Sequence, residues 1–310
     1  MRQASNSQVF VGHFRKISIL VINFIFNRMY VFSFLGFLNR HLNFIGSIFV
    51  AYPASEEYAL AYVYPRHRHL MRWSPYLVGI FLQNRKWGVM FVISSTEKDF
   101  IKPENEKSIR NFVKKTEHIR DLLGAPQKTF AGILPGVLFA KRIIRETVET
   151  DVTVEAITKA EDEVRKAEKY DSNVPLIVLG GMGFVGRRFI RKMKDRKSYC
   201  VDLVHKSGCQ TTWPHHITGQ KAILINLTRK ATLNDYLNLF WPELVLINEV
   251  YPEPSENEIN ILRKIGSPAY HIVGIAAKSY PSFPKAYAGG IPCCAGRLSE
   301  NMRILVKKLN

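Results

Sequence analysis

The stretch that most constrains this chain runs from Val174 to Val204 and reads VPLIVLGGMGFVGRRFIRKMKDRKSYCVDLV. Its apolar opening, Leu176–Leu179, has the length and β-branching of a buried strand. Four glycines and an amphipathic basic segment follow, and a second apolar run, Tyr199–Val204, closes the unit. This order of strand, glycine turn, helix and strand is the context in which a G-x-G-x-x-G pattern indicates a nucleotide-binding turn.

The glycine turn predicts a phosphate site. We expect Gly181 to make the tight turn, Gly183 to let the backbone approach a pyrophosphate, and Gly186 to allow close packing of helix on strand. The N-terminus of the next helix would offer N–H groups and a partial positive charge to the phosphates. The alternative is a glycine-rich turn that serves packing only. The predicted nucleotide contacts are Gly180, Gly181, Met182, Gly183, Phe184, Val185 and Gly186.

Strand-like and helix-like segments alternate after this unit. The pattern predicts strands at Lys221–Leu227, Leu244–Val250 and His271–Ala276, and helices at Leu233–Phe240, Glu256–Ile265 and, closing the chain, Ser299–Leu309. The C-terminal half is therefore predicted to be an α/β, doubly wound parallel sheet of Rossmann type, with ligand at the carboxyl ends of its strands.

The chain before this sheet predicts a separate N-terminal α+β domain. Strands or short helices are expected at Ser47–Tyr52, Tyr58–Tyr64, Tyr76–Leu82 and Trp87–Ile93. Secure helices are expected at Asn105–Leu123, which Gly124 ends, and from a cap at Asp151 or Thr153 to about Lys169. The predicted division is a substrate domain at 29–150 and a dinucleotide-binding domain at 151–310.

Residues 1–28 are basic and apolar, with no acidic residue. The apolar run Ile17–Phe26 is only half a membrane span, and continuation through Met29–Leu38 crosses two asparagines and Arg28. Three interpretations stay open: a membrane-surface anchor, a true span, or an upstream extension before a natural start at Met29, which we favour.

The formal charge of +18, from 44 basic and 26 acidic residues, suggests an anionic partner. Candidates are an acidic carrier protein, a membrane surface or a phosphorylated ligand; a generally basic proteome would give the same composition. Nucleic acid is not expected, because zinc-finger spacings and RNA-binding sheet signatures are absent from the sequence. Four cysteines in 310 residues favour a reducing, cytoplasmic protein, with membrane association as an added alternative.

No metal site is predicted. The pair His67 and His69 lies in a basic segment without neighbouring carboxylates or cysteines. Cys209, His215 and His216 are interpreted as ordinary loop residues.

The residues after the second strand bear on the cofactor. An acid at the end of that strand accepts hydrogen bonds from the ribose 2′-OH of NAD, whereas a cation there suits the 2′-phosphate of NADP. If the strand runs to Val204, Asp202 lies inside it. Lys206 then occupies the position, just after the strand, that contacts the 2′ group of the ribose. NADP bound through Lys206 is therefore preferred, with NAD bound through Asp202 as the alternative.

Near the chain end, Gly289–Gly296 reads GGIPCCAG. A thiol after a glycine–proline turn and just before a helix has its pKa lowered by the helix N-terminus, which makes the thiolate available for attack on a thioester. Cys293 is the candidate nucleophile. The alternative is that small apolar cysteines pack the last helix against the sheet.

The order of these landmarks resembles the long-chain fatty acyl–acyl-carrier-protein reductases of cyanobacterial type over about residues 125–310. The similar segments are Phe130–Val137, Val245–Pro252 and Cys293-Cys294-Ala295. The resemblance implies a two-domain, NADPH-dependent enzyme whose acyl group is carried on Cys293. The chain departs from the family pattern at Gly296, where the family has an acid, and at Asn248-Glu249-Val250, where it has an acid and two glycines.

The sequence thus predicts an NAD(P)H-dependent oxidoreductase that reduces a small-molecule or carrier-bound acyl thioester to an aldehyde. Two alternatives stay open: a non-catalytic nucleotide-binding protein, and an amino-acid or shikimate-type dehydrogenase without a covalent step. The short-chain dehydrogenase and epimerase class is disfavoured, because no tyrosine after the glycine turn has a lysine four positions on.

Overall fold

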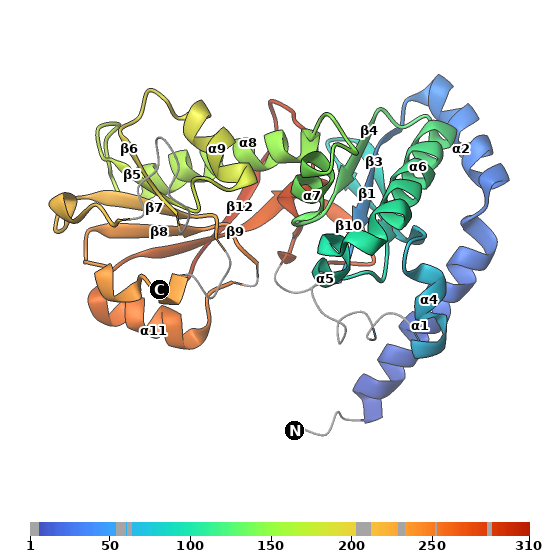
Figure 1. Ribbon diagram of the computed structural model, residues 1–310, viewed down its shortest axis with the longest axis horizontal. Coiled ribbons are helices and arrows are strands. Elements are labelled where there is room, and N and C mark those ends of the chain that lie inside the picture. The colour runs from blue at the N-terminus through green and yellow to red at the C-terminus, as the bar shows by residue number, and fades with distance from the viewer. Residues whose placement is uncertain are drawn as a thin grey trace. The chain divides into compact units, whose positions relative to one another are not determined.

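The computed structural model describes residues 6–53, 60, 64–202, 212–228, 233–251, 253–283 and 287–310, with side chains from residue 16 onward. The chain divides into two compact units. Unit 1 comprises Met1–Glu149 and Ala277–Ser282, and unit 2 comprises Thr150–Ala276 and Phe283–Asn310. Each unit is built on a mixed sheet that contains parallel strands, so the chain is α/β (Figure 1).

The sheet of unit 1 has the strand order β10-β2-β3-β1-β4. β1 pairs in parallel with β3 and β4, whereas β2 is antiparallel to β3 and β10. Parallel pairs at its centre distinguish this sheet from the antiparallel one that an α+β domain usually has. Of the four predicted segments, Tyr58–Tyr64 lies almost wholly outside the described residues and the other three are strands. The strands are β1 (Ile45–Ala51), β2 (Tyr76–Gln83), β3 (Lys86–Val92), β4 (Gln127–Phe130) and β10 (Lys278–Tyr280).

Helices cover this sheet. The predicted helix at Asn105–Leu123 is confirmed, because α6 runs over Glu106–Leu123 and ends at Gly124, whose φ of 60° is left-handed. Its apolar face enters the core with Phe91 and Phe130. Pro135 lies in the first turn of α7, where its missing N–H costs no helical bond. Among the described residues of this unit, further helices include α1 (Asn6–Phe26), α2 (Met29–Leu42), α4 (Arg68–Met71), α5 (Glu97–Ile101) and α7 (Leu134–Ala140).

The sheet of unit 2 carries five parallel strands in the order β9-β8-β7-β5-β6, and two antiparallel additions, β11 and β12, on β9. All five runs predicted as strands form strands here, although the end of the run Tyr199–Val204 lies outside the described residues. The strands are β5 (Leu176–Leu179), β6 (Ser198–Val201), β7 (Ala222–Asn226), β8 (Leu244–Asn248), β9 (Ala269–Ala276), β11 (Gly290–Ile291) and β12 (Ile304–Lys308).

Helices lie on both faces of this sheet, with α8 and α9 on one face and α11 on the other (Figure 1). The central strands are buried throughout, which explains their continuous apolar runs. The helix predicted at Glu256–Ile265 is α11, capped by Ser255 and Glu258 in a capping box. In the segment Leu233–Phe240, Leu233 and Asn234 are helical and Leu237–Leu239 form a short turn of 3-10 helix. The helices α8 (Val148–Ala167) and α9 (Phe184–Lys192) flank the glycine turn in sequence.

The predicted closing helix at Ser299–Leu309 is wrong. Its core is the strand β12, which pairs antiparallel with β9 from Ile304↔Ile275 to Lys308↔Tyr270. β9 pairs with β8 and β11 along one edge, and its other edge would be unpaired without β12. The need of this edge of β9 for a hydrogen-bonded partner therefore outweighs the helical pattern of Ser299–Leu309.

Candidate functional site

The glycine turn joins β5 to α9 and depends on its glycines at three points. Gly180 has a φ of +84°, so it and not Gly181 makes the tight turn. Gly181 packs on β6, where a Cβ would lie 2.4 Å from Cys200 Sγ. Gly186 packs on the turn itself, because its Cβ would lie 2.3 Å from the Gly180 carbonyl oxygen. Gly183 is the N-cap of α9 with extended backbone.

The second strand ends earlier than the sequence suggested. β6 stops at Val201, so Asp202 is the first residue beyond its carboxyl end. The Met182 N–H donates to Asp202 Oδ2 at 2.9 Å, which places this carboxylate directly on the glycine turn. Lys206, the predicted 2′-phosphate ligand, lies outside the described residues. The premise that put Asp202 inside the strand, and so favoured NADP, is therefore wrong.

The ends of the parallel strands form one edge of the sheet. Leu179, Asn226 and Asn248 are in register across β5, β7 and β8. The next residues along each strand, Gly180 and Glu249 among them, therefore lie on this same edge. Adjacent strands are about 4.8 Å apart, so the ends of β5 and β8 are separated by roughly 10 Å. The glycine turn and the end of β8 thus share one edge of unit 2.

A buried polar row lies just inside this edge. Asn226 Nδ2 donates to Asn248 Oδ1 at 2.7 Å, and Asn248 Nδ2 donates to the Val250 carbonyl oxygen at 2.7 Å. His271 continues the row, with Nδ1 3.1 Å from Asn248 Nδ2, and burial lowers the pKa of its imidazole. The row fixes the loop that carries Glu249, whose N–H donates to the Asn226 carbonyl oxygen at 3.2 Å.

Titratable groups gather where β8 ends. Burial raises the pKa of Glu249 to about 7. Burial also raises the pKa of the Cys293 thiol well above its ordinary value, and the charges of Glu249 and Cys294 add to this shift. The Tyr287 hydroxyl has its pKa raised by burial and then by these same cysteines, Tyr251 and Glu249. These five side chains are therefore electrostatic neighbours, and Glu249 is the member that exchanges a proton near neutral pH.

Cys293 does not have the surroundings that the sequence predicted. Cys293–Ala295 form a single turn of 3-10 helix, and the chain then leads to β12 and not to a helix. The thiol is buried and lies beside a carboxylate, so its pKa is raised and not lowered. The predicted activation by a helix N-terminus is therefore wrong, although Cys293 does lie near the end of β8.

Glu249 gives a pH-dependent prediction. A folded-state pKa of about 7 exceeds the value near 4.5 of an unfolded glutamate, so the stabilisation from protonated Glu249 is complete below pH 4.5 and is lost as the pH rises through 7. We expect Glu249→Gln to unfold with a free energy about 1–3 kcal/mol higher than wild type at pH 8, and to match wild type near pH 4.5. Urea denaturation at both values tests this, and parallel pH profiles for the two proteins would contradict it.

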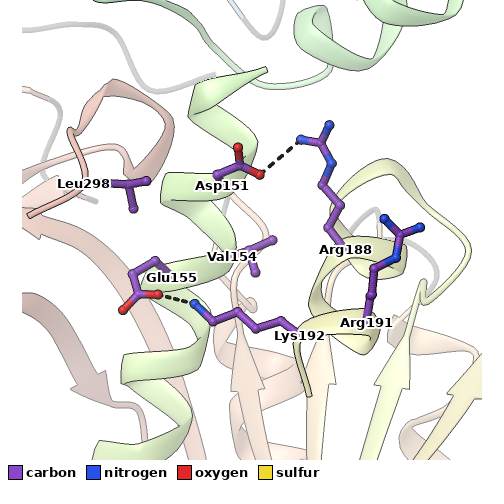
Figure 2. A pocket seen from close by; sticks show the side chains of 7 residues that line it. All are labelled: Asp151, Val154, Glu155, Arg188, Arg191, Lys192 and Leu298. Atoms are coloured by element: carbon purple, nitrogen blue, oxygen red, sulfur yellow. Dashed lines mark hydrogen bonds and ion pairs between the residues drawn. The ribbon is translucent and has the colours of Figure 1, made fainter. Parts of the chain in front are cut away.

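A surface pocket between α8 and α9 is not a good ligand site (Figure 2). Four of its five charged groups pair with one another: Arg188 pairs with Asp151 at 3.5 Å, and Lys192 pairs with Glu155. These pairs hold α9, which follows the glycine turn, against α8. None of the predicted site residues lines the pocket, which is formed by Asp151, Val154, Glu155, Arg188, Arg191, Lys192 and Leu298.

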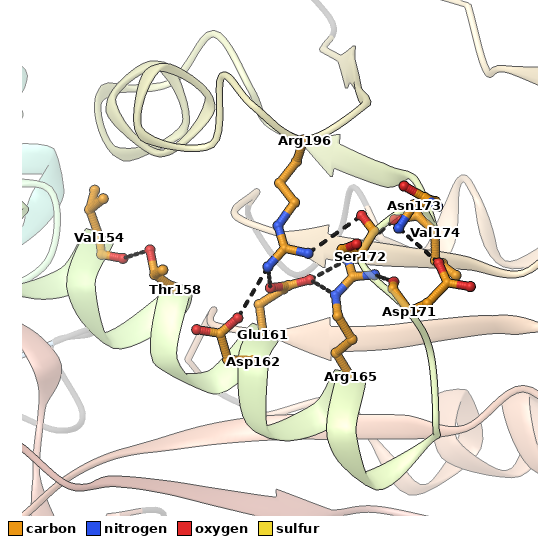
Figure 3. Close-up of polar contacts among 10 residues, drawn as sticks. All are labelled: Val154, Thr158, Glu161, Asp162, Arg165, Asp171, Ser172, Asn173, Val174 and Arg196. Atoms are coloured by element: carbon orange, nitrogen blue, oxygen red, sulfur yellow. Dashed lines mark hydrogen bonds and ion pairs between the residues drawn. The ribbon is translucent and has the colours of Figure 1, made fainter.

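A buried ion pair anchors the segment that leads into β5 (Figure 3). Arg165 Nε donates to Glu161 Oε1 at 2.6 Å, and the same guanidinium bonds the carbonyl oxygens of Asp171 and Val174. Arg196 Nη2 lies 3.8 Å from Glu161 Oε2. Burial raises the pKa of Glu161 despite these cations. The cluster therefore fixes the start of β5, and with it the position of the glycine turn, at the cost of a desolvated charge.

Two further features concern cysteine and metal chemistry. Cys200, in β6 beneath the glycine turn, is disulfide-bonded, which does not fit the prediction of a reduced chain. Cys209, the other cysteine of this region, lies outside the described residues. Within the part of the chain that the structure describes, no group of three or more His, Cys, Asp or Glu side chains could hold a metal ion.

Comparison with known proteins adds no assignment: no protein-family model matches the sequence, and no curated protein is significantly similar to it.

Proposed function

We propose that unit 2 is a Rossmann-like domain that binds a nicotinamide dinucleotide at the glycine turn between β5 and α9. In a doubly wound sheet, ligands bind outside the carboxyl ends of the strands, where the strand order reverses. Here β6 and β7 lie on opposite sides of β5, so the reversal falls between β5 and β7. The turn that ends β5 borders this point, and the first turn of α9 offers N–H groups to phosphates.

One observation carries the choice of cofactor. Asp202 follows β6 directly and accepts from the Met182 N–H of the glycine turn. A carboxylate in this place accepts hydrogen bonds from a ribose 2′-OH and repels a 2′-phosphate. NAD is therefore proposed in preference to NADP, which reverses the preference drawn from the sequence.

The cofactor proposal is tested with NADH and NADPH titrations of the full chain. Wild type should bind NADH at least about tenfold more tightly than NADPH, and Asp202→Asn should narrow that difference by removing the repelling charge. Asp195→Asn, at an exposed acid of the same unit, is the matched control and should leave the ratio unchanged. Tighter binding of NADPH by the wild type would refute the role given to Asp202.

For the reaction, we propose hydride transfer to a carbonyl with Glu249 as proton donor or acceptor. A group whose pKa is about 7 is suited to this work, and Glu249 lies on the same edge of the sheet as the glycine turn. This is the dehydrogenase chemistry that needs no covalent intermediate. The buried polar row of Asn226, Asn248 and His271 would hold the carboxylate in place.

Reduction of an acyl thioester through Cys293 is the second candidate, favoured by the closeness of Cys293 to Glu249. The Cys293 thiolate would displace the carrier thiol, and hydride would then release an aldehyde and regenerate the thiolate. An acidic carrier protein would suit the charge of +18. The raised pKa of Cys293 works against this route. If aldehyde formation from acyl thioesters is lost in Cys293→Ala but kept in Glu249→Gln, the second candidate replaces the first.

The same titrations and substrate assays distinguish a non-catalytic nucleotide-binding role from the two catalytic candidates. Saturable NADH binding without cofactor consumption across carbonyl and thioester substrates would support it.

A further inference from the structure

An apolar face with basic residues runs along the first two helices of unit 1. On α1, Ile17, Val21, Phe24 and Ile25 follow helical spacing, and Phe24 is 73% exposed. On α2, Tyr30, Phe34 and Phe37 do the same at exposures of 72%, 62% and 54%. We call these seven side chains the α1–α2 face. Large apolar side chains exposed together along one side of a helix mark an interaction site, because soluble surfaces rarely carry them.

The opposite sides of both helices are fixed to the protein core. Asn23 of α1 bonds both the N–H and the carbonyl oxygen of Leu77 in β2, at 2.8 and 2.7 Å. Asn39 of α2 accepts from the Ile45 N–H at 2.6 Å. Gly36 lies so close to α6 that a Cβ would stand 1.7 Å from the Leu122 carbonyl oxygen. Neither helix can therefore be surrounded by lipid without losing these contacts.

The described helices also do not form a simple span. No single helix among the described residues is long and apolar enough to cross a membrane; Lys16–Phe26 and Met29–Leu42 meet that test only together, and they are bent by 72°. Each of these helices packs one side on the core of unit 1 and exposes apolar residues on the other side. Such helices are suited to lie in the plane of a membrane surface.

The charges beside this face are positive. The sequence holds no acidic residue before Glu56, whereas Arg28, the N-cap of α2, and Arg40, in the last turn of α2, are exposed. Near the start of the face, Lys16 lies over the Tyr64 ring at 5.2 Å and Arg66 lies over the same ring at 6.0 Å. The turn Pro65–His67, which carries Arg66 and precedes α4, therefore adjoins α1, and Figure 1 shows α4 beside α1.

We propose that the α1–α2 face docks on an anionic phospholipid surface, with its aromatic and aliphatic side chains in the interfacial layer and these cations against the headgroups. Apolar burial supplies part of the binding, and each cation near a negative leaflet strengthens it. Charge complementarity selects this occupant over an uncharged apolar protein surface. The proposal is independent of the nucleotide site in unit 2.

The test is co-sedimentation of the full chain with phosphatidylcholine vesicles, with and without phosphatidylserine. Wild type should bind the anionic vesicles at least about tenfold more tightly than the neutral ones, and salt should weaken this binding. Phe34→Glu/Phe37→Glu should lose at least about tenfold in affinity, as should Arg28→Glu/Arg40→Glu. The matched control is Ile101→Glu/Phe139→Glu, at exposed apolar residues of the same unit (66% and 44%), and should bind like wild type.

Three results would overturn the proposal. Equal binding to both vesicle types would remove the role of the cations. Absence of vesicle binding by folded wild type would remove the membrane. Light scattering that shows a wild-type dimer, with monomeric Phe34→Glu/Phe37→Glu and no vesicle binding by either protein, would assign the face to a second copy of this chain.

Discussion

Arg165→Met is expected to lower the free energy of unfolding by about 3–5 kcal/mol. Removal of the guanidinium leaves the fully buried Glu161 without its main partner and takes a donor from the carbonyl oxygens of Asp171 and Val174. Burial already raises the pKa of Glu161, so loss of the cation leaves the carboxyl protonated or its charge uncompensated. Urea denaturation at neutral pH measures the loss.

Two further variants show whether the ion pair itself is responsible. Glu161→Leu/Arg165→Met removes both charges and should recover most of the lost stability, because an apolar pair of similar volume needs no compensation. Arg110→Met breaks the exposed pair with Glu106 and should cost less than about 1 kcal/mol. A loss below 1 kcal/mol for Arg165→Met would show that the cluster does not anchor β5.

Gly186→Ala is expected to have the second large effect. The added Cβ would lie 2.3 Å from the Gly180 carbonyl oxygen and 2.7 Å from the Gly181 Cα, and both of these are backbone atoms of the turn. Either α9 must move away from β5 or the turn must change shape, and we expect destabilisation by about 3 kcal/mol or more. Thermal and urea unfolding would measure it, together with loss of nucleotide binding.

Gly183→Ala provides the contrast within the same turn. Its Cβ would lie 3.1 Å from the Gly180 carbonyl oxygen, and the extended backbone of Gly183 is open to any residue. The cost to folding should stay below about 1 kcal/mol. If Gly183→Ala were as destabilising as Gly186→Ala, the close packing would not be specific to Gly186, and the difference proposed between the two glycines would be wrong.

The sheet of unit 2 was predictable because its strands are buried on both faces. Runs such as Leu176–Leu179 and Leu244–Asn248 are continuously apolar, and β-turn and helix signals separate them. The closing strand β12 was not predictable, because its basic residues Lys307 and Lys308 lie at the exposed end of a short pattern that also suits a helix. The edge of β9 that needs a pairing partner decides in favour of a strand over a helix, and this edge exists only in the folded protein.

The candidate site was predictable in part. The glycine pattern identified the turn, but a difference of three residues, whether β6 ends at Val201 or Val204, decided the proposed cofactor. The buried row was missed, although its signal is present: Asn226 and Asn248 each sit as a polar last residue on an apolar strand. The raised pKa of the Cys293 thiol could not be predicted from the sequence, since it depends first on burial and then on the charge of Glu249, more than forty positions away in the chain.

The central claim is that the glycine turn of unit 2 binds a nicotinamide dinucleotide, and a fluorescence titration of the full chain with NADH tests it most directly. Wild type should bind NADH saturably, and Gly183→Ala, although stably folded, should bind at least about tenfold more weakly because its methyl group stands where a phosphate approaches. Absence of saturable binding of NADH and NADPH by folded wild type, or unchanged affinity in Gly183→Ala, would contradict the account.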